Sequence, residues 1–261
     1  MTHKQQQREQ HNLVFTAGSR EHVLSNDPAI KYIVSWRIDE SIKRLVSAAN
    51  GRLTKDSSIL VLCAGEGLEG SILCDLGFLD VTVSDLAEEG VRAALQRDVR
   101  LKGLVLDAEQ TGLAKDSFDI VFVQDGLHHL QSPVQGLTEM LRIGRSGIVF
   151  LEGHDTLICR LSGTTWERNG TAVNYVFRWK ERFLEQVASS FLGPDNFECH
   201  VFTFWHHNLV YARFLAILGS NMGLLCVKAV KLILDSLLGR FGNQFCGIVL
   251  KRRAAAGDPR T

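Results

Sequence analysis

Residues 59–70 read ILVLCAGEGLEG, an apolar run that leads directly into a loop with glycines at positions 65, 67 and 70. This order predicts a buried strand, a bare turn and the start of a helix. In an open α/β sheet, a ligand approaches the backbone at such a turn because glycine places no side chain in the way. The same spacing is also typical of tight packing between helix and strand, so the glycines alone are weak evidence for a ligand.

Short apolar runs alternate with helical stretches between residues 59 and 152. This alternation predicts βαβ units and a parallel sheet covered by helices on both faces. Two further runs, ECHVFTFW and QFCGIVLKR, flank a long helical region at 209–241. We therefore expect a doubly wound α/β fold with a mostly parallel sheet of about seven strands that ends in an antiparallel pair. Helical insertions would cover it as a lid.

The chain divides into five expected segments around this sheet. Ser132 and Pro133 are a good N-cap and first-turn pair for a helix with Val134, Leu137, Met140 and Leu141 on one stripe. The polar residues 1–12 predict a disordered start. The segments are an N-terminal tail and helical cap at 1–56, a core at 57–155, an acceptor-lid segment at 156–197, C-terminal strands with a helical insertion at 198–253, and a tail at 254–261.

Composition limits the partners and the compartment. The 261 residues carry 29 basic and 29 acidic side chains, so no global field favours nucleic acid or an anionic membrane. The six cysteines are single and show no metal-ligand spacing, which indicates reduced thiols and a cytoplasmic location. The start lacks the apolar core of a signal peptide. The longest uncharged stretch, fourteen residues at 214–227, is shorter than the roughly twenty that a spanning helix needs.

Asp85 ends the second predicted strand, twenty residues after Gly65. An acid at this place can accept hydrogen bonds from both hydroxyls of a ribose. A dinucleotide would bring its pyrophosphate to the helix start, where Glu66 and Glu69 would repel it. S-adenosylmethionine carries a cationic sulfonium and an ammonium instead, which acidic neighbours favour. The two glutamates therefore favour S-adenosylmethionine, although both could simply point to solvent.

Four stretches resemble class I S-adenosylmethionine-dependent methyltransferases of the small-molecule type: LVLCAGEGLEG, VSDLAEEG, LVLDAEQTGLAKDSFDIV and VFVQDGLHHLQSP. The resemblance covers about residues 57–152 and implies a Rossmann-like fold. It implies that Asp107 accepts from the adenine amino group, that the Ala108 amide bonds a ring nitrogen, and that the Gln124 carbonyl supports the methionine part. The expected cofactor-binding residues are Ala64, Gly65, Glu66, Gly67, Asp85, Leu86, Asp107, Ala108 and Gln124.

Cys63 departs from the family pattern. The family usually has an acid near the end of the first strand to hold the methionine ammonium, and here we assign Cys63 to that place. Since a thiol cannot supply this charge, Glu66 or another residue would have to compensate.

Methyl transfer is an in-line displacement, so the protein mainly aligns acceptor and methyl group and excludes water. A hydroxyl or protonated amine also needs a base, and histidine is suitable near neutral pH. The candidates are His129 and His128 after the fourth strand, with Glu152 and His154 after the fifth as rivals. We expect Asp155 to cap a helix beginning at Thr156. The pair His206–His207 has no partner at metal-ligand spacing and predicts no metal site.

The acceptor pocket should come from the variable segments. Aromatic and basic residues interleave at 160–183, which suits either a flat or anionic acceptor or arginines over an aromatic core. The apolar region 209–241 could lie on a membrane, cover a greasy substrate or pack against the sheet edge.

The sequence thus predicts a methyltransferase acting on an oxygen or nitrogen of a small molecule, with S-adenosyl-L-homocysteine as the product of the donor. A non-catalytic S-adenosylmethionine-binding regulatory module is the alternative. An NAD-dependent reductase is disfavoured, and so is nucleic acid as acceptor, because no Asn-Pro-Pro-aromatic element follows the fourth strand. A homodimer and peripheral membrane contact remain open.

Overall fold

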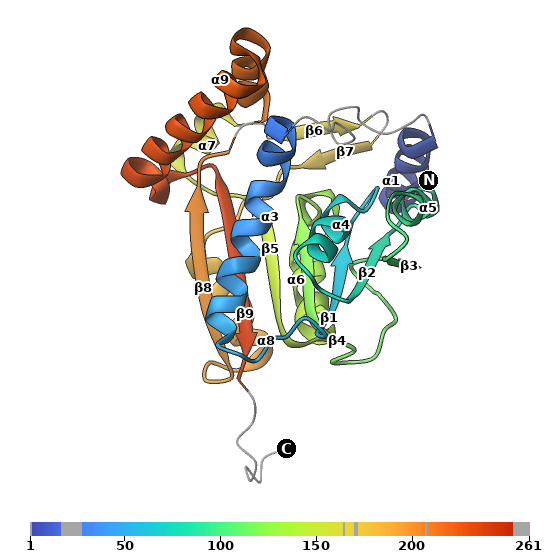
Figure 1. Ribbon diagram of the computed structural model, residues 1–261. Coiled ribbons are helices and arrows are strands. Elements are labelled where there is room, and N and C mark those ends of the chain that lie inside the picture. Colours follow the sequence, from blue (N-terminus) through green and yellow to red (C-terminus); the bar gives the residue numbers. More distant parts are fainter. Residues whose placement is uncertain (1, 17–27, 164, 170–171, 207, 253–261) are drawn as a thin grey trace.

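One sheet organises the protein (Figure 1). The computed structural model describes residues 2–16, 28–163, 165–169, 172–206 and 208–252. Within them the seven-stranded sheet has the order β3-β2-β1-β4-β5-β9-β8. Its strands are β1 Ser58–Leu62, β2 Asp80–Asp85, β3 Lys102–Val105, β4 Phe118–Gln124, β5 Gly144–Gly153, β8 Phe197–Phe204 and β9 Gln244–Lys251.

The strand directions confirm the predicted doubly wound, mostly parallel sheet. Strands β1 to β5 run parallel, whereas β9 is antiparallel to both β5 and β8. The chain order reverses between β1 and β4, which pair directly with Leu60 opposite Val121. In such sheets the crevice for a ligand lies at the carboxyl ends of the strands at this switch point. The fold therefore places a site above Leu62 and Gln124.

Helices cover both faces of the sheet, as continuously apolar strands require. On one face lie α3 Pro28–Ala49, α4 Leu68–Asp75 and α5 Glu88–Arg97, and on the other lie α6 Pro133–Ile143 and α8 Glu181–Leu192. The predicted stripe of α6 is confirmed, because Leu137, Met140 and Leu141 are fully buried. Ser132 is its N-cap residue but makes no side-chain capping hydrogen bond.

The N-terminal residues form helix α1, His3–Thr16, so the prediction of a disordered start is wrong. α1 contacts α5 and lies near β7 (Figure 1). The Asn12 side chain accepts from the Glu89 amide at 3.2 Å, and Phe15 packs over Gly65 and Gly90. Lys4, Gln7 and Asn12 of this helix have partners elsewhere in the protein, which composition alone does not reveal.

The segment after β5 contains a short helix, which the sequence predicted, and a hairpin, which the sequence did not indicate. α7 Leu157–Ser162 is followed by a two-stranded antiparallel sheet of β6 Trp166–Asn169 and β7 Ala172–Tyr175. The N-cap of α7 is Thr156, whose hydroxyl accepts from the Cys159 amide at 3.1 Å. The predicted helix is therefore present but begins at Leu157, and the prediction that Asp155 is its cap is wrong. Asp155 instead pairs with Arg160 at 2.6 Å, a stronger partner for a carboxylate.

Between β8 and β9 the chain forms α9 Asn208–Leu238 and the short η2 Gly239–Phe241. Gly219 interrupts α9 with a φ of 74°. By length and composition, Val210–Phe241 could cross a membrane, and this test is also passed by core helices of soluble proteins. His206 is buried against Tyr211, which supports the structural interpretation of this residue. His207 and the expected tail at 254–261 lie outside the described residues.

Candidate functional site

A cavity of about 270 Å³ lies at the carboxyl ends of β1 and β2 and extends to the loop after β4. Its floor comes from the loop after β1 and from the turns after β2 and β3. The helix α1 forms the opposite wall with Lys4, Gln7, His11, Val14 and Phe15. The position matches the switch point of the sheet, so this cavity is the candidate donor site.

The glycine-rich loop begins at Cys63, and its three glycines have different roles. Gly67 has a φ of 74°, and a Cβ there would lie 2.5 Å from the Ala94 Cβ. A Cβ on Gly70 would lie 2.5 Å from the Val83 side chain. These two glycines are therefore needed for packing. Gly65, with a φ of 49°, lines the cavity and is the place where backbone is exposed to a ligand.

Asp85 is buried below this loop. Its Oδ2 accepts from the Gly65 amide and its Oδ1 from the Ala87 amide, each at 2.9 Å. Burial raises the pKa of Asp85, and the two amides oppose this rise. Since a carboxylate has about four acceptor positions, these amides leave acceptor capacity for ligand donors such as ribose hydroxyls.

Asp107, the predicted adenine partner, already has two donors. Its Oδ2 lies 2.6 Å from the Lys4 Nζ, and its Oδ1 accepts from the Glu109 amide at 2.9 Å. The same ammonium lies 2.7 Å from Glu109, whose other oxygen accepts from the Ser132 amide. Lys4 thus occupies the carboxylate that the adenine amino group would contact.

The two glutamates of the loop face different partners. Glu66 pairs with Arg97 on α5 at 3.1 Å, and both side chains are largely buried. Glu69 lines the cavity and accepts from the Gln124 side chain at 3.2 Å. Burial raises the pKa of Glu69 to about 7, against the opposing effects of its backbone hydrogen bond and of Arg37. Glu69, rather than Glu66, is therefore the acid available to a cationic ligand.

Cys63 lines the same part of the cavity in a left-handed conformation, φ 52°, that favours glycine. Burial and then the charge of Asp85 raise the pKa of its thiol well above the usual value. The thiol therefore stays protonated and supplies no negative charge. The Gln124 Oε1 nearby is buried without a hydrogen-bond partner among the described residues.

Asp125 follows β4 with a φ of 49° and also lines the cavity. Its carboxylate pairs with Arg37 of α3, whose other nitrogen donates to Gln244 at 3.1 Å. Burial would raise the pKa of Asp125, but the charges of Arg37 and His128 hold it below the usual value. A non-glycine residue in this conformation is strained, and such strain often occurs at functional sites.

His128 lies in the turn η1, Leu127–His129, and is held between carboxylates. Its Nδ1 is 2.7 Å from the fully buried Glu152, which also accepts from the Leu127 amide at 2.6 Å. Its Nε2 is 3.4 Å from Glu167 of β6. Burial would lower the pKa of His128, but Glu152 and Glu167 together raise it to about 11. His128 is thus a cation, and Glu152 is fully engaged.

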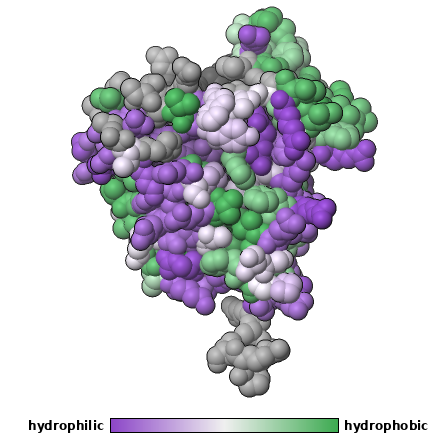
Figure 2. Space-filling model, turned by 180° about the vertical axis from the view of Figure 1, so that it is seen from behind, coloured by the Kyte–Doolittle hydropathy of each residue, from purple (hydrophilic) through white to green (hydrophobic). Residues whose placement is uncertain are grey.

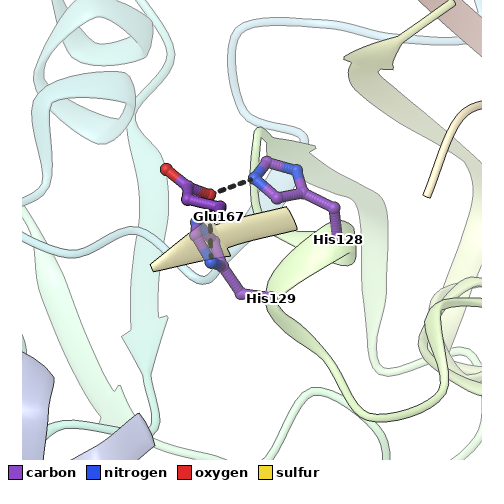
Figure 3. Close-up of side chains that lie close together, drawn as sticks. All are labelled: His128, His129 and Glu167. Atoms are coloured by element: carbon purple, nitrogen blue, oxygen red, sulfur yellow. Dashed lines mark ion pairs between the residues drawn. The ribbon is translucent and has the colours of Figure 1, made fainter. Parts of the chain in front are cut away.

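His129 has the opposite character, although it is the next residue. Burial and the neighbouring His128 charge lower its pKa to about 3, so it is neutral. Its Nδ1 faces the Asn174 amide nitrogen at 2.8 Å and lies 3.9 Å from Glu167. Figure 3 shows Glu167 reaching from β6 toward both rings. The sequence did not identify Glu167 because it lies 38 positions after His129 in the chain.

The structure places most predicted donor residues around one cavity. Ala64, Gly65, Glu66, Asp85, Leu86, Asp107 and Ala108 line it, as does His129. The residues described as lining this cavity do not include the predicted donor residues Gly67 and Gln124. Of the predicted catalytic residues, they also do not include His128, Glu152 and His154. His154 bonds the Gly242 carbonyl at 2.8 Å and holds the start of β9. The side chains contributed by α1 were missed, because a short polar helix gives no apolar period to detect.

The aromatic residues at 166–183 divide into two groups. Phe177, Trp179 and Phe183 pack in the core with α6 and α8. Trp166 and Tyr175 lie exposed on the β6–β7 hairpin with ring centroids 5.3 Å apart. The first group belongs to the core, whereas the second is available to a ligand.

Ligand atoms of His128, His129 and Glu167 lie within 4.8 Å of one another, close enough to hold a metal ion. The raised pKa of His128 makes this imidazole a proton donor at neutral pH, and a metal would have to displace that proton. The absence of a metal site stays a prediction.

The chain resembles known methyltransferases in sequence. Residues 60–151 match the family model described as a methyltransferase domain. A demethylmenaquinone methyltransferase from Beutenbergia cavernae is 31% identical over 134 residues, which are 51% of this chain and 53% of that protein. One from Renibacterium salmoninarum is 30% identical over 105 residues, 40% of this chain and 44% of that protein. The chain therefore spans about half the length of these curated relatives.

Solved structures support the fold. A putative sarcosine dimethylglycine methyltransferase from Galdieria sulphuraria has a TM-score of 0.58 at 15% identity, covering 94% of this chain and 98% of the other. The magnesium protoporphyrin IX methyltransferase from Synechocystis, solved with bound SAM, has a TM-score of 0.56 at 14% identity, covering 97% and 98%. The family match confirms the predicted class I methyltransferase domain with S-adenosylmethionine as its cofactor, and the structural likeness confirms the Rossmann-like fold.

Proposed function

We propose that this chain, whose residues 60–151 form a methyltransferase domain, is an enzyme that methylates an oxygen or nitrogen of a small molecule. The observation that carries the proposal is a single cavity with Asp85 below the bare Gly65 and a buried acid, Glu69, at its far side. This arrangement suits a ligand with ribose hydroxyls and a positive charge.

The cofactor, when bound, supplies a methyl group on a cationic sulfur. Residues of the chain fit the cofactor at the ribose, the adenine and the methionine. Asp85 retains acceptor positions for the ribose hydroxyls, and Asp107 and Ala108 line the cavity where adenine would lie. At the methionine side, Glu69 lines the cavity and supplies the negative charge that Cys63 lacks. Glu69 therefore compensates for Cys63 in this proposal.

On the acceptor side we assign the proton-accepting role to His129. The ring is neutral and lines the cavity, whereas His128 is already protonated and Glu152 is engaged by it. The Asn174 side-chain NH₂ can only donate a hydrogen bond, so the Nδ1 of His129 carries the lone pair. The hydroxyl group of the methyl-accepting substrate would replace Asn174 as the donor to this nitrogen. Glu167 is near enough to stabilise the resulting imidazolium.

Several observations support a small molecule as the methyl acceptor. Both curated relatives are named for a small molecule, demethylmenaquinone. The exposed Trp166 and Tyr175 offer aromatic surface for a flat acceptor. The zero net charge makes nucleic acid a poor acceptor.

The compartment is a separate part of the proposal. The six free cysteines suit the cytoplasm. The open question of a homodimer would be addressed by light scattering.

A regulatory, non-catalytic module is the second candidate, because α1 covers the site. Lys4 contacts Asp107, and Phe15 rests on Gly65 where a donor would approach. Such a helix would suit a protein that changes its surface when the donor binds.

Two measurements separate the candidates. Isothermal titration calorimetry with S-adenosyl-L-homocysteine tests the donor site, and tritiated methyl transfer to aqueous and organic metabolite extracts tests catalysis. We expect both binding and a labelled product that is lost in His129→Ala. Binding without label in any extract would favour the module, and no binding would overturn both functions.

A further inference from the structure

The helix α9 is apolar on the side that faces solvent as well as on the side that faces the protein. Tyr211, Gly223, Val227 and Lys231 face inward and are buried. The opposite side carries large exposed side chains, each between 41% and 69% accessible. We call them the α9 outer face: Leu218, Met222, Leu225, Leu232 and Ile233.

A helix that is hydrophobic all round belongs in apolar surroundings. Yet only 17% of the most apolar window of Val210–Phe241 is buried within the protein. Figure 2 shows the hydrophobic side chains gathered over this helix at the upper right, with hydrophilic groups at their margin. An exposed patch of this kind marks an interaction site.

The charges around the patch select the partner. Arg213, Lys228 and Arg240 are exposed along α9 and η2. Asp235, the acid of this segment, is engaged by the buried Lys231 at 2.8 Å and by the Trp205 amide. A second copy would bring the same cations against these, so self-association is disfavoured. An anionic surface with an apolar interior matches both features.

The shape of α9 indicates contact along a bilayer surface. Gly219 breaks the helix, and a Cβ on Gly223 would lie 2.8 Å from the Leu215 Cα, so the two parts of α9 pack on each other. Neither a break of this kind nor the charges at Lys228 and Asp235 suit a continuous membrane span.

The helix α7 adds apolar surface at the same end of the sheet (Figure 1), with Leu157 and Leu161 more than 70% exposed. It begins three residues after His154, which bonds the Gly242 carbonyl just beyond η2. The β5 strand that leads to α7 also carries Glu152, which contacts His128, the neighbour of the cavity residue His129. A surface that contacts α7 and α9 would therefore lie at the carboxyl end of the sheet, near the cavity.

We propose that the α9 outer face, together with α7, docks the protein reversibly on an anionic lipid bilayer. The apolar side chains enter the headgroup boundary, and Arg213, Lys228 and Arg240 lie against anionic headgroups. This docking goes beyond the proposed methyl transfer and does not depend on it.

Flotation with vesicles tests the proposal. Wild-type protein should float with vesicles of phosphatidylcholine and phosphatidylglycerol and much less with phosphatidylcholine alone, and added salt should weaken the binding. Leu225→Asn with Leu232→Asn should lower the affinity at least roughly tenfold. The matched control is Leu79→Asn with Val99→Asn, which replaces two apolar side chains that are more exposed than Leu225 and Leu232. They lie before β2 and β3 at the opposite end of the sheet, and this variant should bind as wild type.

A charge variant, Arg213→Gln with Lys228→Gln and Arg240→Gln, should lose affinity on the order of a hundredfold for the anionic vesicles. Thermal unfolding of each variant checks that the fold is intact, and no step requires a donor. Failure here therefore leaves the methyl transfer untouched. Absence of flotation at low salt, equal loss in the control, or a wild-type dimer that Leu225→Asn with Leu232→Asn dissociates would overturn the proposal.

Discussion

The Lys4 Nζ lies 2.6 Å from the Asp107 Oδ2, so an N-terminal helix reaches across the cavity to the carboxylate that is predicted to contact adenine. The contact links α1 to the turn after β3, and Phe15 of the same helix packs over the glycine-rich loop. We therefore expect donor binding in this cavity to rearrange the wall formed by α1, and this expectation gives predictions for affinity.

Lys4→Met should strengthen donor binding, because the adenine amino group no longer competes with an ammonium for Asp107. Both side chains are about one-third exposed, so the gain should be less than about 1 kcal/mol, or roughly fivefold. Calorimetry with S-adenosyl-L-homocysteine measures this. Lys102→Met, which breaks the exposed pair with Asp80, is the control. Weaker binding in Lys4→Met would mean that Lys4 holds α1 over the bound donor.

Asp85→Asn should weaken donor binding by about 1–3 kcal/mol, since an NH₂ group, which only donates hydrogen bonds, replaces one carboxylate oxygen in a buried site. Asp80→Asn, at the exposed start of the same strand, should bind as wild type. Calorimetry on both variants provides the comparison. Unchanged donor affinity in Asp85→Asn would show that the ribose does not bind next to Asp85.

Donor affinity should rise with pH through about 7, because the cationic donor binds the ionised form of Glu69. Binding should release a proton, which appears as a dependence of the calorimetric enthalpy on the buffer. Glu69→Gln should weaken binding and remove this pH dependence, whereas Glu66→Gln should keep it. An unaltered pH profile in Glu69→Gln would assign the titration to another group.

The same carboxyl should affect stability with the opposite trend. Its folded pKa of about 7 is above the usual value of 4.5, so the free protein loses stability as pH rises from about 4.5 to about 7. Glu69→Gln should therefore unfold at a higher temperature than wild type at pH 8 and show little difference at pH 4.5. Thermal scans in the absence of donor measure this, and a constant difference between the two proteins at all pH values would contradict the assignment.

The two adjacent histidines should separate stability from turnover. His128→Ala leaves the buried Glu152 without its cation and should cost about 3–5 kcal/mol of unfolding free energy. Because the pKa of His128 is raised to about 11, this contribution is full below about pH 6.5 and declines as pH approaches 11.

His129→Ala should instead keep most of the stability and the donor affinity but slow methyl transfer by about 10²–10⁴-fold. Urea unfolding and turnover, measured on both variants, distinguish the two roles. Equal losses of stability in both would show that the pair acts as one structural unit.

The sequence by itself determined the sheet. Continuous apolar runs such as 59–62 and 120–123 could only be buried on both faces, and the turn signals between them allowed a parallel order. The same local reasoning placed Gly65 and Asp85 together, because the ends of neighbouring parallel strands meet at one edge. It could not separate the packing roles of Gly67 and Gly70 from exposure of Gly65 to a ligand.

Only the tertiary structure decided the wall of the cavity and the charge of its histidines. Lys4 contacts Asp107, which lies 103 positions further along the chain. Glu167 approaches His129 from the β6–β7 hairpin, which no periodicity of the sequence indicated. Burial raises the pKa of Glu69 to about 7. Glu152 and Glu167 make His128 a cation beside a neutral His129. Residue type and spacing indicate which groups can carry charge, but desolvation and partner distance set the charge, and both depend on the folded chain.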